Sequence, residues 1–338
     1  MIDVAIIDSG IHMTDTDICS MVSKGFSIDY SDGNTVYQNE YNDLNGHGTY
    51  CASIIRRFCP DVKLTIIKIL DQCKMGRSEC LIEALHYLYH NPVDVISMSL
   101  STQDNQYEKE LGIICKKIEE SGMIMVSSLA NHAEISYPAV YEGVIGVKGA
   151  LFLEEKEYIY HPDRVIQCQG SSIPVLVEGV DGTYTFFGGN SKAAANISGI
   201  IASLLQKFGM TDDFGALFKE YSCHTKKNEQ TITISSIINS NVTISGELCE
   251  EKDFKKLITI MQNVLEIPMR KSQLIFECSI LHPELNIDKK NFGKLIKEIE
   301  REWKIHFRKE EVNLLSIRDI TTIYSLLKRT EKYESNQK

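Results

Sequence analysis

Short apolar runs alternate with longer amphipathic segments through the first part of the chain. The apolar runs are rich in β-branched residues, as is typical of parallel strands buried on both faces of a sheet; they span residues 4–7, 64–70, 93–100, 123–128 and 144–147. Helical periodicity predicts helices over residues 50–58, 78–89 and 109–120. Because strands and helices alternate, we expect an α/β fold with a doubly wound parallel sheet and helices on both faces.

The pattern changes after this part of the chain. Residues 228–250 are polar and rich in Ser, Thr, Asn and Ile, which predicts a linker that follows a first domain of residues 1–227. Three segments with helical periodicity follow, at residues 254–265, 290–303 and 317–327. They predict a small all-α helical domain over residues 251–332.

The distribution of charge agrees with a change of domain. Residues 1–250 contain 18 basic and 32 acidic side chains, whereas residues 251–338 contain 18 basic and 14 acidic ones. An acidic first part argues against nucleic acid as a partner. The basic part has no dense run of Lys and Arg with interleaved aromatic residues, so we interpret it as a solvated helical surface. No apolar stretch is long enough to cross a bilayer, so no membrane partner is expected.

The cysteine spacing and the first residues of the chain indicate in which cellular compartment the protein is found. The ten cysteines form no C-x-x-C pair, which argues against a zinc site. Met1 leads directly into a strand-like pattern, without the basic and apolar regions of a secretory signal. We therefore expect reduced thiols and a cytoplasmic protein. The alternative is that a signal or propeptide has been trimmed from the chain.

Three short segments carry the residue types needed for nucleophilic catalysis. Asp8 directly follows the first apolar run, and Gly10 allows the chain to turn away sharply. His47 lies between two glycines at the start of a helical segment. Ser191 lies where a glycine-rich turn leads into another helical segment, and a helix N-terminus stabilises developing negative charge. Asp8 follows the carboxyl end of a predicted strand, and open α/β sheets bind their ligands at the edge where these ends lie.

These segments resemble the D-S/T-G, H-G-T and G-T-S-M-A motifs of the subtilase family of serine peptidases, in that family's order. Four more segments agree: residues 68–70 resemble K-V-L, 95–101 resemble V-I-N-M-S-L-G, 125–131 resemble the strand that ends in A-G-N, and 137–147 resemble Y-P-A with V-I-A-V-G. The resemblance covers about 210 residues and implies a subtilisin-like fold and a serine endopeptidase.

The resemblance also implies a role for each matching residue. Ser191 is the expected nucleophile, His47 its general base, and Asp8 the carboxylate that orients His47. The Asn131 side chain is the expected oxyanion donor, together with the Ser191 N–H. The segment Ser99, Leu100 and Ser101 is the expected edge that binds an extended peptide substrate. No cofactor is implied.

Several positions depart from the family pattern. Lys192 replaces the usual Met, which places a cation either near the leaving group or a peptide carboxylate, or in solvent. Ala195 replaces a common Pro. Only seven residues precede Asp8, so the family's N-terminal calcium site is doubtful and we expect no essential metal. Cys51 follows His47 by one helical turn; it is either a thiol of the kind that makes some subtilases sensitive to bulky thiol reagents, or a small buried hydrophobe.

The C-terminal part is similar to acyl or peptidyl carrier proteins. Residues 254–267 fit the first helix of that family, and residues 285–300 resemble its second helix. Lys289 occupies the position of the serine that carries phosphopantetheine, and a lysine cannot form the phosphodiester. The resemblance therefore implies a carrier-like domain without its prosthetic arm, suited to docking a precursor peptide or a biosynthetic partner. The alternative is an unrelated helical bundle.

Together these features predict a cytoplasmic serine endopeptidase that removes a leader from a precursor peptide, as in the maturation of ribosomal natural products. Three alternatives remain open. The first is a general intracellular protease. The second is a peptide ligase or macrocyclase, at which Lys192 and Ala195 hint. The third is an inactive scaffold that binds through its C-terminal part. The complete Asp, His and Ser set argues against the scaffold.

Overall fold

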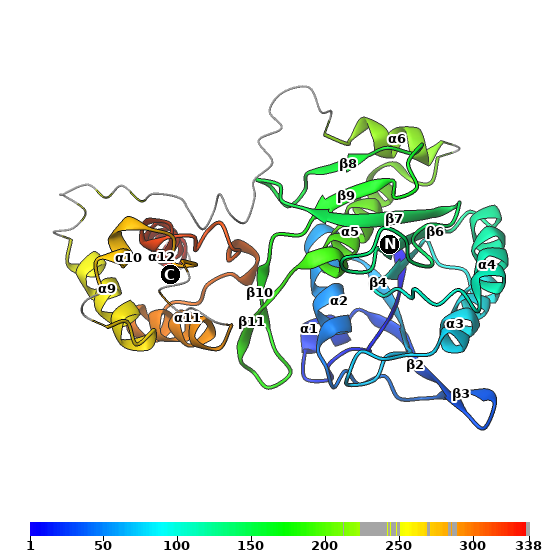
Figure 1. Cartoon of the computed structure of the whole chain (residues 1–338), viewed down its shortest axis with the longest axis horizontal. Coiled ribbons are helices and arrows are strands. Elements are labelled where there is room, and N and C mark those ends of the chain that lie inside the picture. Colours follow the sequence, from blue (N-terminus) through cyan, green and yellow to red (C-terminus); the bar gives the residue numbers. More distant parts are fainter. Residues whose placement is uncertain are drawn as a thin grey trace. The chain divides into compact units, whose positions relative to one another are not determined.

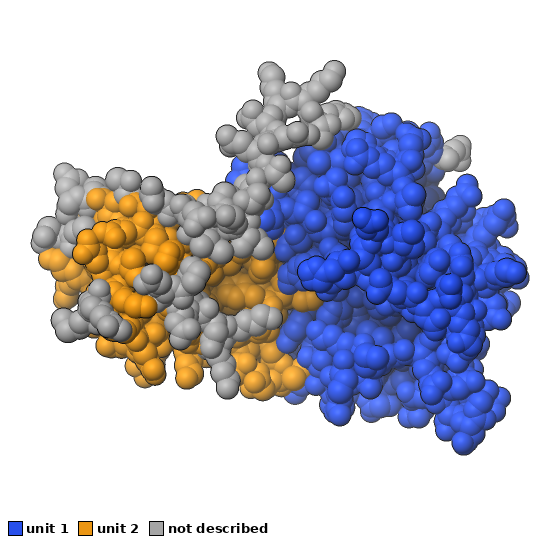
Figure 2. Space-filling view, in the orientation of Figure 1, with its two compact units in different colours: residues 1–172, 188–229 blue, residues 173–187, 230–338 orange. Residues whose placement is uncertain are grey.

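The computed structural model describes residues 1–211, 213–223, 251–268, 271–282 and 289–335, together with residues 242, 244, 248 and 285. The chain forms two compact units, shown separately by colour in Figure 2. Unit 1 comprises Met1–Ser172 and Gly188–Glu229, and unit 2 comprises Ile173–Phe187 and Gln230–Lys338. The predicted linker at 228–250 lies almost entirely outside the described residues, so its boundaries stay a prediction. Residues 173–187 group with the C-terminal unit, although they lie within the predicted first domain of residues 1–227.

Unit 1 contains a nine-stranded sheet within the part of the chain that the structure describes, in the order β3-β2-β4-β1-β5-β6-β7-β9-β8. Its pairs are parallel except for the edge pairs β2–β3 and β8–β9. The strands are β1 (Asp3–Asp8), β2 (Val22–Ser31), β3 (Asn34–Gln38), β4 (Lys63–Lys68), β5 (Val95–Met98), β6 (Ile124–Ser128), β7 (Val144–Ala150), β8 (Tyr158–Tyr160) and β9 (Cys168–Ser171).

Helices cover both faces of this sheet (Figure 1). Helices α2 (His47–Phe58) and α5 (Gly189–Phe208) pack against each other on one face. Helices α3 (Ser78–His90) and α4 (Glu108–Glu120) cover the other, where alternate β1 residues Ala5 and Ile7 join their apolar side chains in one core. The short helices α1 (Thr16–Cys19) and α6 (Phe214–Glu220) complete the unit. The predicted doubly wound α/β fold is confirmed.

The strand register aligns the carboxyl ends of the central strands. In the ladder, Asp8 of β1 pairs with Lys68 of β4, and Ile7 pairs with Met98 of β5. Met98 in turn pairs with Ser127 of β6. Residues that directly follow these strands therefore emerge at one edge of the sheet, which is where parallel α/β sheets build their sites.

Unit 2 combines a β-hairpin with helices around a core of its own. The hairpin consists of β10 (Val175–Glu178) and β11 (Tyr184–Phe187). The helices are α9 (Lys252–Val264), α10 (Leu274–Glu277), α11 (Lys289–Trp303), the 3₁₀ turn η3 (Lys309–Glu311) and α12 (Ile320–Ser335). The three predicted C-terminal helices are confirmed. The likeness to carrier proteins stays a prediction, because residues 286–288 and the side chain of Lys289 lie outside what is described.

No helix in the described ranges is both long enough and apolar enough to span a lipid bilayer.

Candidate active site

Asp8 and His47 form a buried pair at the carboxyl end of β1. His47 Nδ1 lies 2.8 Å from Asp8 Oδ1, and the two residues are 7% and 1% exposed. The Ser9 N–H also donates to Asp8 Oδ1, at 2.7 Å, and Cys51 Sγ lies 3.7 Å from the other carboxylate oxygen. Asp8 is thus oriented by several donors, which is the environment expected of a carboxylate that fixes a histidine tautomer.

A second buried carboxylate holds the start of the helix that carries His47. Asp43 accepts hydrogen bonds from the N–H groups of Asn45, Gly46 and Thr49 at 2.9, 2.7 and 3.0 Å, and from the Thr49 hydroxyl at 2.7 Å. These groups belong to the first turn of α2 and to the residues before it, where helix N–H groups lack partners within the helix. Asp43 therefore fixes the position from which His47 projects, a role that sequence reasoning did not identify.

Two glycines allow α2 to approach the end of β1. A Cβ atom on Gly48 would lie 2.3 Å from the carbonyl oxygen of Gly10, and one on Gly10 would lie 2.2 Å from the carbonyl oxygen of Tyr41. Gly10 also has φ of 103°, a conformation that favours glycine. A side chain at Gly48 would force the helix away from the strand, and so separate His47 from Asp8, whereas one at Gly10 would displace the segment at Tyr41 that precedes the helix.

The electrostatics of the pair favour the protonated imidazole. Burial lowers the pKa of His47, but the charge of Asp8 and the hydrogen bond to Asp8 outweigh it, so the pKa is raised overall. Burial, with the Asp8 charge, raises the pKa of Cys51, which keeps it a thiol near neutral pH. When the ring is neutral with its N–H on Nδ1 toward Asp8, Nε2 is the nitrogen that can take a proton from a nucleophile, and Asp8 then stabilises the imidazolium that forms.

The same three side chains also have the donor types of a metal site. Ligand atoms of Asp8, His47 and Cys51 lie within 4.8 Å of one another. Carboxylate, imidazole and thiolate groups bind zinc in proteins, but Cys51 would first have to lose its proton. The absence of an essential metal stays a prediction.

Ser191 lies in the first turn of α5 and is brought to the same edge by β5. Its hydroxyl donates to the carbonyl oxygen of Ser99 at 3.1 Å, and the Ser99 hydroxyl donates to the carbonyl oxygen of Ser191 at 3.0 Å. Ser99 directly follows β5, which lies beside β1 and Asp8. Nucleophilic attack requires the Ser191 hydroxyl to leave the Ser99 carbonyl oxygen and turn toward His47.

Asn190 connects the turn before Ser191 to two more strand ends. Its Nδ2 donates to the carbonyl oxygen of Leu129 at 2.8 Å, and its Oδ1 accepts the N–H of Gly149 at 2.8 Å. Leu129 directly follows β6, and Gly149 lies in β7. Asn190 occupies the Thr position of the G-T-S motif, and its positioning role was not predicted.

Asn131 lies three residues after the end of β6 and is exposed. The neighbouring Ala130 N–H donates to Ser136 Oγ at 2.9 Å, which anchors this segment. The link from Asn190 to Leu129 places the Asn131 segment next to the turn that carries Ser191. The role of Asn131 as an oxyanion donor stays a prediction.

The three residues expected to bind the substrate, Ser99, Leu100 and Ser101, have different surroundings in the structure. Ser99 is 5% exposed, and its hydroxyl and carbonyl oxygen both bind Ser191. Leu100 and Ser101 are half-buried, and the next residue, Thr102, exchanges two backbone hydrogen bonds with Tyr137. Ser99 therefore positions the candidate nucleophile, while peptide binding by Leu100 and Ser101 stays a prediction.

Lys192 points neither to a leaving group nor to solvent. Its side chain is 0% exposed, and Nζ lies 3.3 Å from Ser171 Oγ and 3.7 Å from Glu155 Oε1. The other oxygen of Glu155 binds Arg57 Nη1 at 2.7 Å. Burial lowers the pKa of Lys192 to about 8, against the opposing charge of Glu155. The lysine after the candidate nucleophile thus belongs to an ionic cluster in which Lys192 is fully buried and Arg57 and Glu155 are partly exposed.

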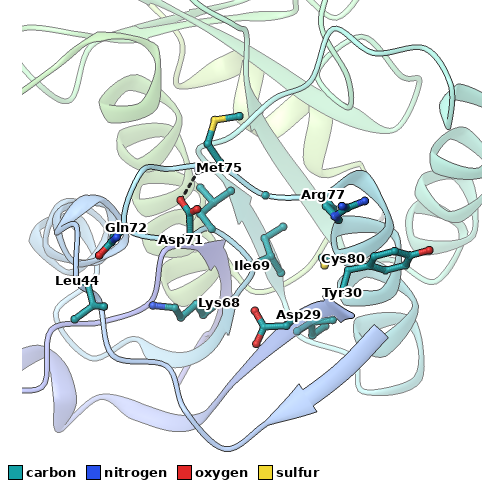
Figure 3. A pocket seen from close by; sticks show the side chains of 13 residues that line it. Asp29, Tyr30, Leu44, Lys68, Ile69, Asp71, Gln72, Met75, Arg77 and Cys80 are labelled. Carbon is teal, nitrogen blue, oxygen red and sulfur yellow. Dashed lines mark hydrogen bonds between the residues drawn. The ribbon is translucent and has the colours of Figure 1, made fainter. Parts of the chain in front are cut away.

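An open pocket of about 420 Å³ lies beside the end of β4 (Figure 3). Lys68, Asp71 and Arg77 line it, together with Asp29 and Met75. The Asp71 carboxylate accepts the N–H of Met75 at 2.9 Å and so holds the loop at the mouth of the pocket. Because Lys68 pairs with Asp8 across the sheet, this recess with charges of both signs lies at the same edge as the candidate catalytic residues.

A parallel sheet with an aspartate at one strand end, a buried histidine bonded to it and a serine at a helix start defines a hydrolase of the subtilisin class. The model of the family described as Subtilase family matches residues 2–237. The chain therefore belongs to the subtilase family of serine endopeptidases.

Individual relatives are distant. The "Major intracellular serine protease" of Bacillus subtilis (strain 168) is 25% identical over 77% of this chain and 86% of its own. The "Intracellular serine protease" of Paenibacillus polymyxa is 25% identical over 61% of this chain and 67% of its own. A solved structure titled "Crystal Structure of a Lanthipeptide Protease" superposes with a TM-score of 0.49 and 19% identity, over 61% of this chain and 74% of that chain.

Proposed function

We propose that Asp8, His47 and Ser191 form the catalytic triad of this endopeptidase, and that its substrate is a precursor peptide from which it removes a leader. The observation that carries the triad is the buried Asp8–His47 bond of 2.8 Å, with Ser191 held by Ser99 on the neighbouring strand. The processing role takes place in the cytoplasm, without nucleic acid, membrane or cofactor.

The reaction uses the two ring nitrogens of His47 in different ways. Nε2 takes the proton of the Ser191 hydroxyl while Oγ attacks the scissile carbonyl carbon, and the imidazolium that forms is stabilised by Asp8 at Nδ1. His47 then gives this proton to the leaving amine, which releases one peptide and leaves an acyl-enzyme on Ser191. Water deprotonated by His47 hydrolyses the ester and regenerates the serine.

The developing oxyanion is bound by the Asn131 side chain and the Ser191 N–H. The N–H lies in the first turn of α5, where backbone N–H groups have no partner within the helix. Asn190 binds the segment that leads to Asn131, and this contact fixes the position of the Ser191 N–H relative to the Asn131 side chain. A preorganised pair of donors of this kind lowers the barrier by about 3 kcal/mol per donor.

Two features support a dedicated enzyme over a general protease. The Ser191 hydroxyl is bonded to a carbonyl oxygen rather than presented for attack, so a fitted substrate that displaces this bond is favoured. The chain also adds a second unit with its own apolar core, which gives a surface for docking a precursor peptide or a biosynthetic partner. General proteolysis, peptide ligation and an inactive scaffold remain the alternatives.

The triad is tested by labelling the wild type and Ser191→Ala with a fluorophosphonate probe, followed by intact mass measurement. One adduct on the wild type and none on Ser191→Ala is the expected result. A wild type that takes no adduct, under conditions where a known subtilisin is labelled, would favour the scaffold.

The substrate class is tested by comparing casein with a library of peptides that carry defined N-terminal extensions. A leader protease cuts few library members, each at one site, and leaves casein intact. Extensive digestion of casein would identify a general protease, and a product lighter than its precursor by one water would identify a cyclase.

A further inference from the structure

The two helices that carry His47 and Ser191 lie directly against each other within unit 1. Helix α2 begins at His47, and α5 carries Ser191 in its first turn. The helices approach closely at Gly199 of α5, where a Cβ atom would lie 3.0 Å from the carbonyl oxygen of Ile55 in α2. The position of Ser191 relative to His47 therefore depends on how α5 is held against α2.

One residue from outside both helices is bonded to each of them. Glu155 lies in the loop between β7 and β8, and its Oε2 lies 2.7 Å from Nη1 of Arg57 in α2. Its Oε1 lies 3.7 Å from Nζ of Lys192 in α5. Its carbonyl oxygen accepts a hydrogen bond of 2.9 Å from Nδ2 of Asn196, also in α5. Glu155 thus links α2 to α5 by three contacts, and all of these residues belong to unit 1.

The loop that carries Glu155 is itself fixed to the sheet. The Glu157 N–H donates to the carbonyl oxygen of Glu154 at 3.1 Å, and the Glu154 N–H donates to the Glu157 carboxylate at 3.0 Å. The loop connects Ala150 at the end of β7 to Tyr158 at the start of β8, and both strands pair with β9. Glu155 therefore projects from a turn with little freedom to follow a displaced helix.

The contact with Lys192 depends on charge. The Lys192 side chain is 0% exposed, and a buried ammonium group needs an anion or several acceptors to compensate it. Its Nζ donates to Ser171 Oγ at 3.3 Å, and Glu155 Oε1 is buried and accepts no hydrogen bond from the described residues. Burial and the charge of Arg57 lower the pKa of Lys192, whereas the charge of Glu155 raises it. The carboxylate therefore compensates two cations that would otherwise repel each other.

We infer that Glu155 is a positioning residue that aligns Ser191 with His47, because it bonds to both of the helices that carry them. It acts through the helices and not on the reacting atoms. The inference rests on the proposed roles of Ser191 and His47 in catalysis. It also gives a function to Lys192, which connects the residue next to the nucleophile to this carboxylate.

Glu155→Gln in the full-length chain tests this inference, because it removes the negative charge and keeps the shape of the side chain. Glu154→Gln is the matched control, since Glu154 is an exposed glutamate of the same loop that pairs with Lys156. The readouts are the second-order rate constant and the end point of Ser191 labelling by a small fluorophosphonate. We expect Glu155→Gln to label about tenfold more slowly to the same end point, because small misplacements of a nucleophile are costly. Glu154→Gln should label at the wild-type rate.

Two substitutions of Arg57 distinguish alignment by an ion pair from a general loss of packing. Arg57→Lys keeps a cation at this position of α2 and should retain most of the labelling rate. Arg57→Met keeps apolar volume but loses the contact with Glu155, so it should label about as slowly as Glu155→Gln. This pair also decides the question if Glu155→Gln does not fold, which a lost labelling end point would reveal.

A double variant tests whether Glu155 and Lys192 act through one contact. Lys192→Met alone should slow labelling by a few fold. Glu155→Gln combined with Lys192→Met should label no more slowly than Glu155→Gln alone, because the second substitution removes a contact that is already broken and leaves no unpaired buried cation. Two residues with independent effects would instead multiply their losses in rate.

Wild-type labelling rates in both Glu155→Gln and Arg57→Met would overturn the inference, and so would multiplied losses in the double variant. Either result would leave the proposed function intact. Failure of the wild type itself to label at Ser191 would instead remove the proposed function on which the inference rests.

Discussion

Replacing Lys192 with methionine should change how the stability of unit 1 depends on pH. The ammonium group is fully buried, and burial lowers its pKa from the ordinary value of 10.5 to about 8. At about 1.36 kcal/mol per pH unit, this corresponds to a penalty of about 3 kcal/mol for holding the charge in the folded protein. Lys192→Met removes that charge with a side chain of similar length.

The sign of the effect follows from the proton balance. Between pH 8 and 10.5 the unfolded chain keeps the lysine proton, whereas the folded protein releases it. The unfolding free energy of the wild type therefore rises with pH across this window, relative to Lys192→Met. Below pH 8 both states are protonated and the difference is constant. The buried tyrosines and cysteines titrate in the same way in both proteins, so their effects cancel in the difference.

Urea unfolding of both proteins at pH 7.5 and pH 10 measures this difference. Circular dichroism is the suitable probe, because the single tryptophan, Trp303, lies in unit 2. We expect the unfolding free energy of the wild type, relative to that of Lys192→Met, to be about 2–3 kcal/mol higher at pH 10 than at pH 7.5. Lys207→Met, an exposed lysine on the same helix, is the control and should show no such gain. If the difference in unfolding free energy between the wild type and Lys192→Met stays constant with pH, the conclusion that burial destabilises the charged form of Lys192 is refuted.

Four further predictions concern the edge of the sheet. Asp8→Asn should lower kcat by about ten-thousandfold with KM little changed, measured by steady-state peptide cleavage. Asn131→Ala should lower kcat by about 10²–10³-fold, and an unchanged kcat would exclude it as the oxyanion donor. Asn190→Leu should lower the unfolding free energy by about 1–3 kcal/mol for each unpaired partner and slow fluorophosphonate labelling. In peptide mass spectra after iodoacetamide treatment of the native protein, Cys73 should be alkylated and Cys51 not.

The central strands and main helices of unit 1 could be predicted because their periodicity is local. The buried strand of residues 4–7 and the segment that starts at His47 are examples: each is defined by its own sequence and appears in the structure within a few residues. Asp8, His47 and Ser191 could be found for a related reason, since each lies in a short motif at the end of such an element.

The hairpin and Lys192 could not be predicted in the same way. The strands of the hairpin pack on helices that follow them by more than about 100 residues, so no local pattern shows which unit they join. The orientation of Lys192 depends on Glu155 and Arg57, which come from different segments and meet only in the folded protein. Long-range contacts of this kind have no signature in a single sequence.

The divided composition of unit 2 also affects the order in which the protein is completed on the ribosome. Phe186 is synthesised about 140 residues before Leu327, which belongs to the core that Phe186 packs against; at roughly 5–20 residues per second this is a delay of about 7–28 s. During that interval Ser191 and its helix have emerged, but the helices that hold the preceding hairpin have not. A nascent chain therefore carries the candidate nucleophile well before it carries the helices that complete the core of unit 2.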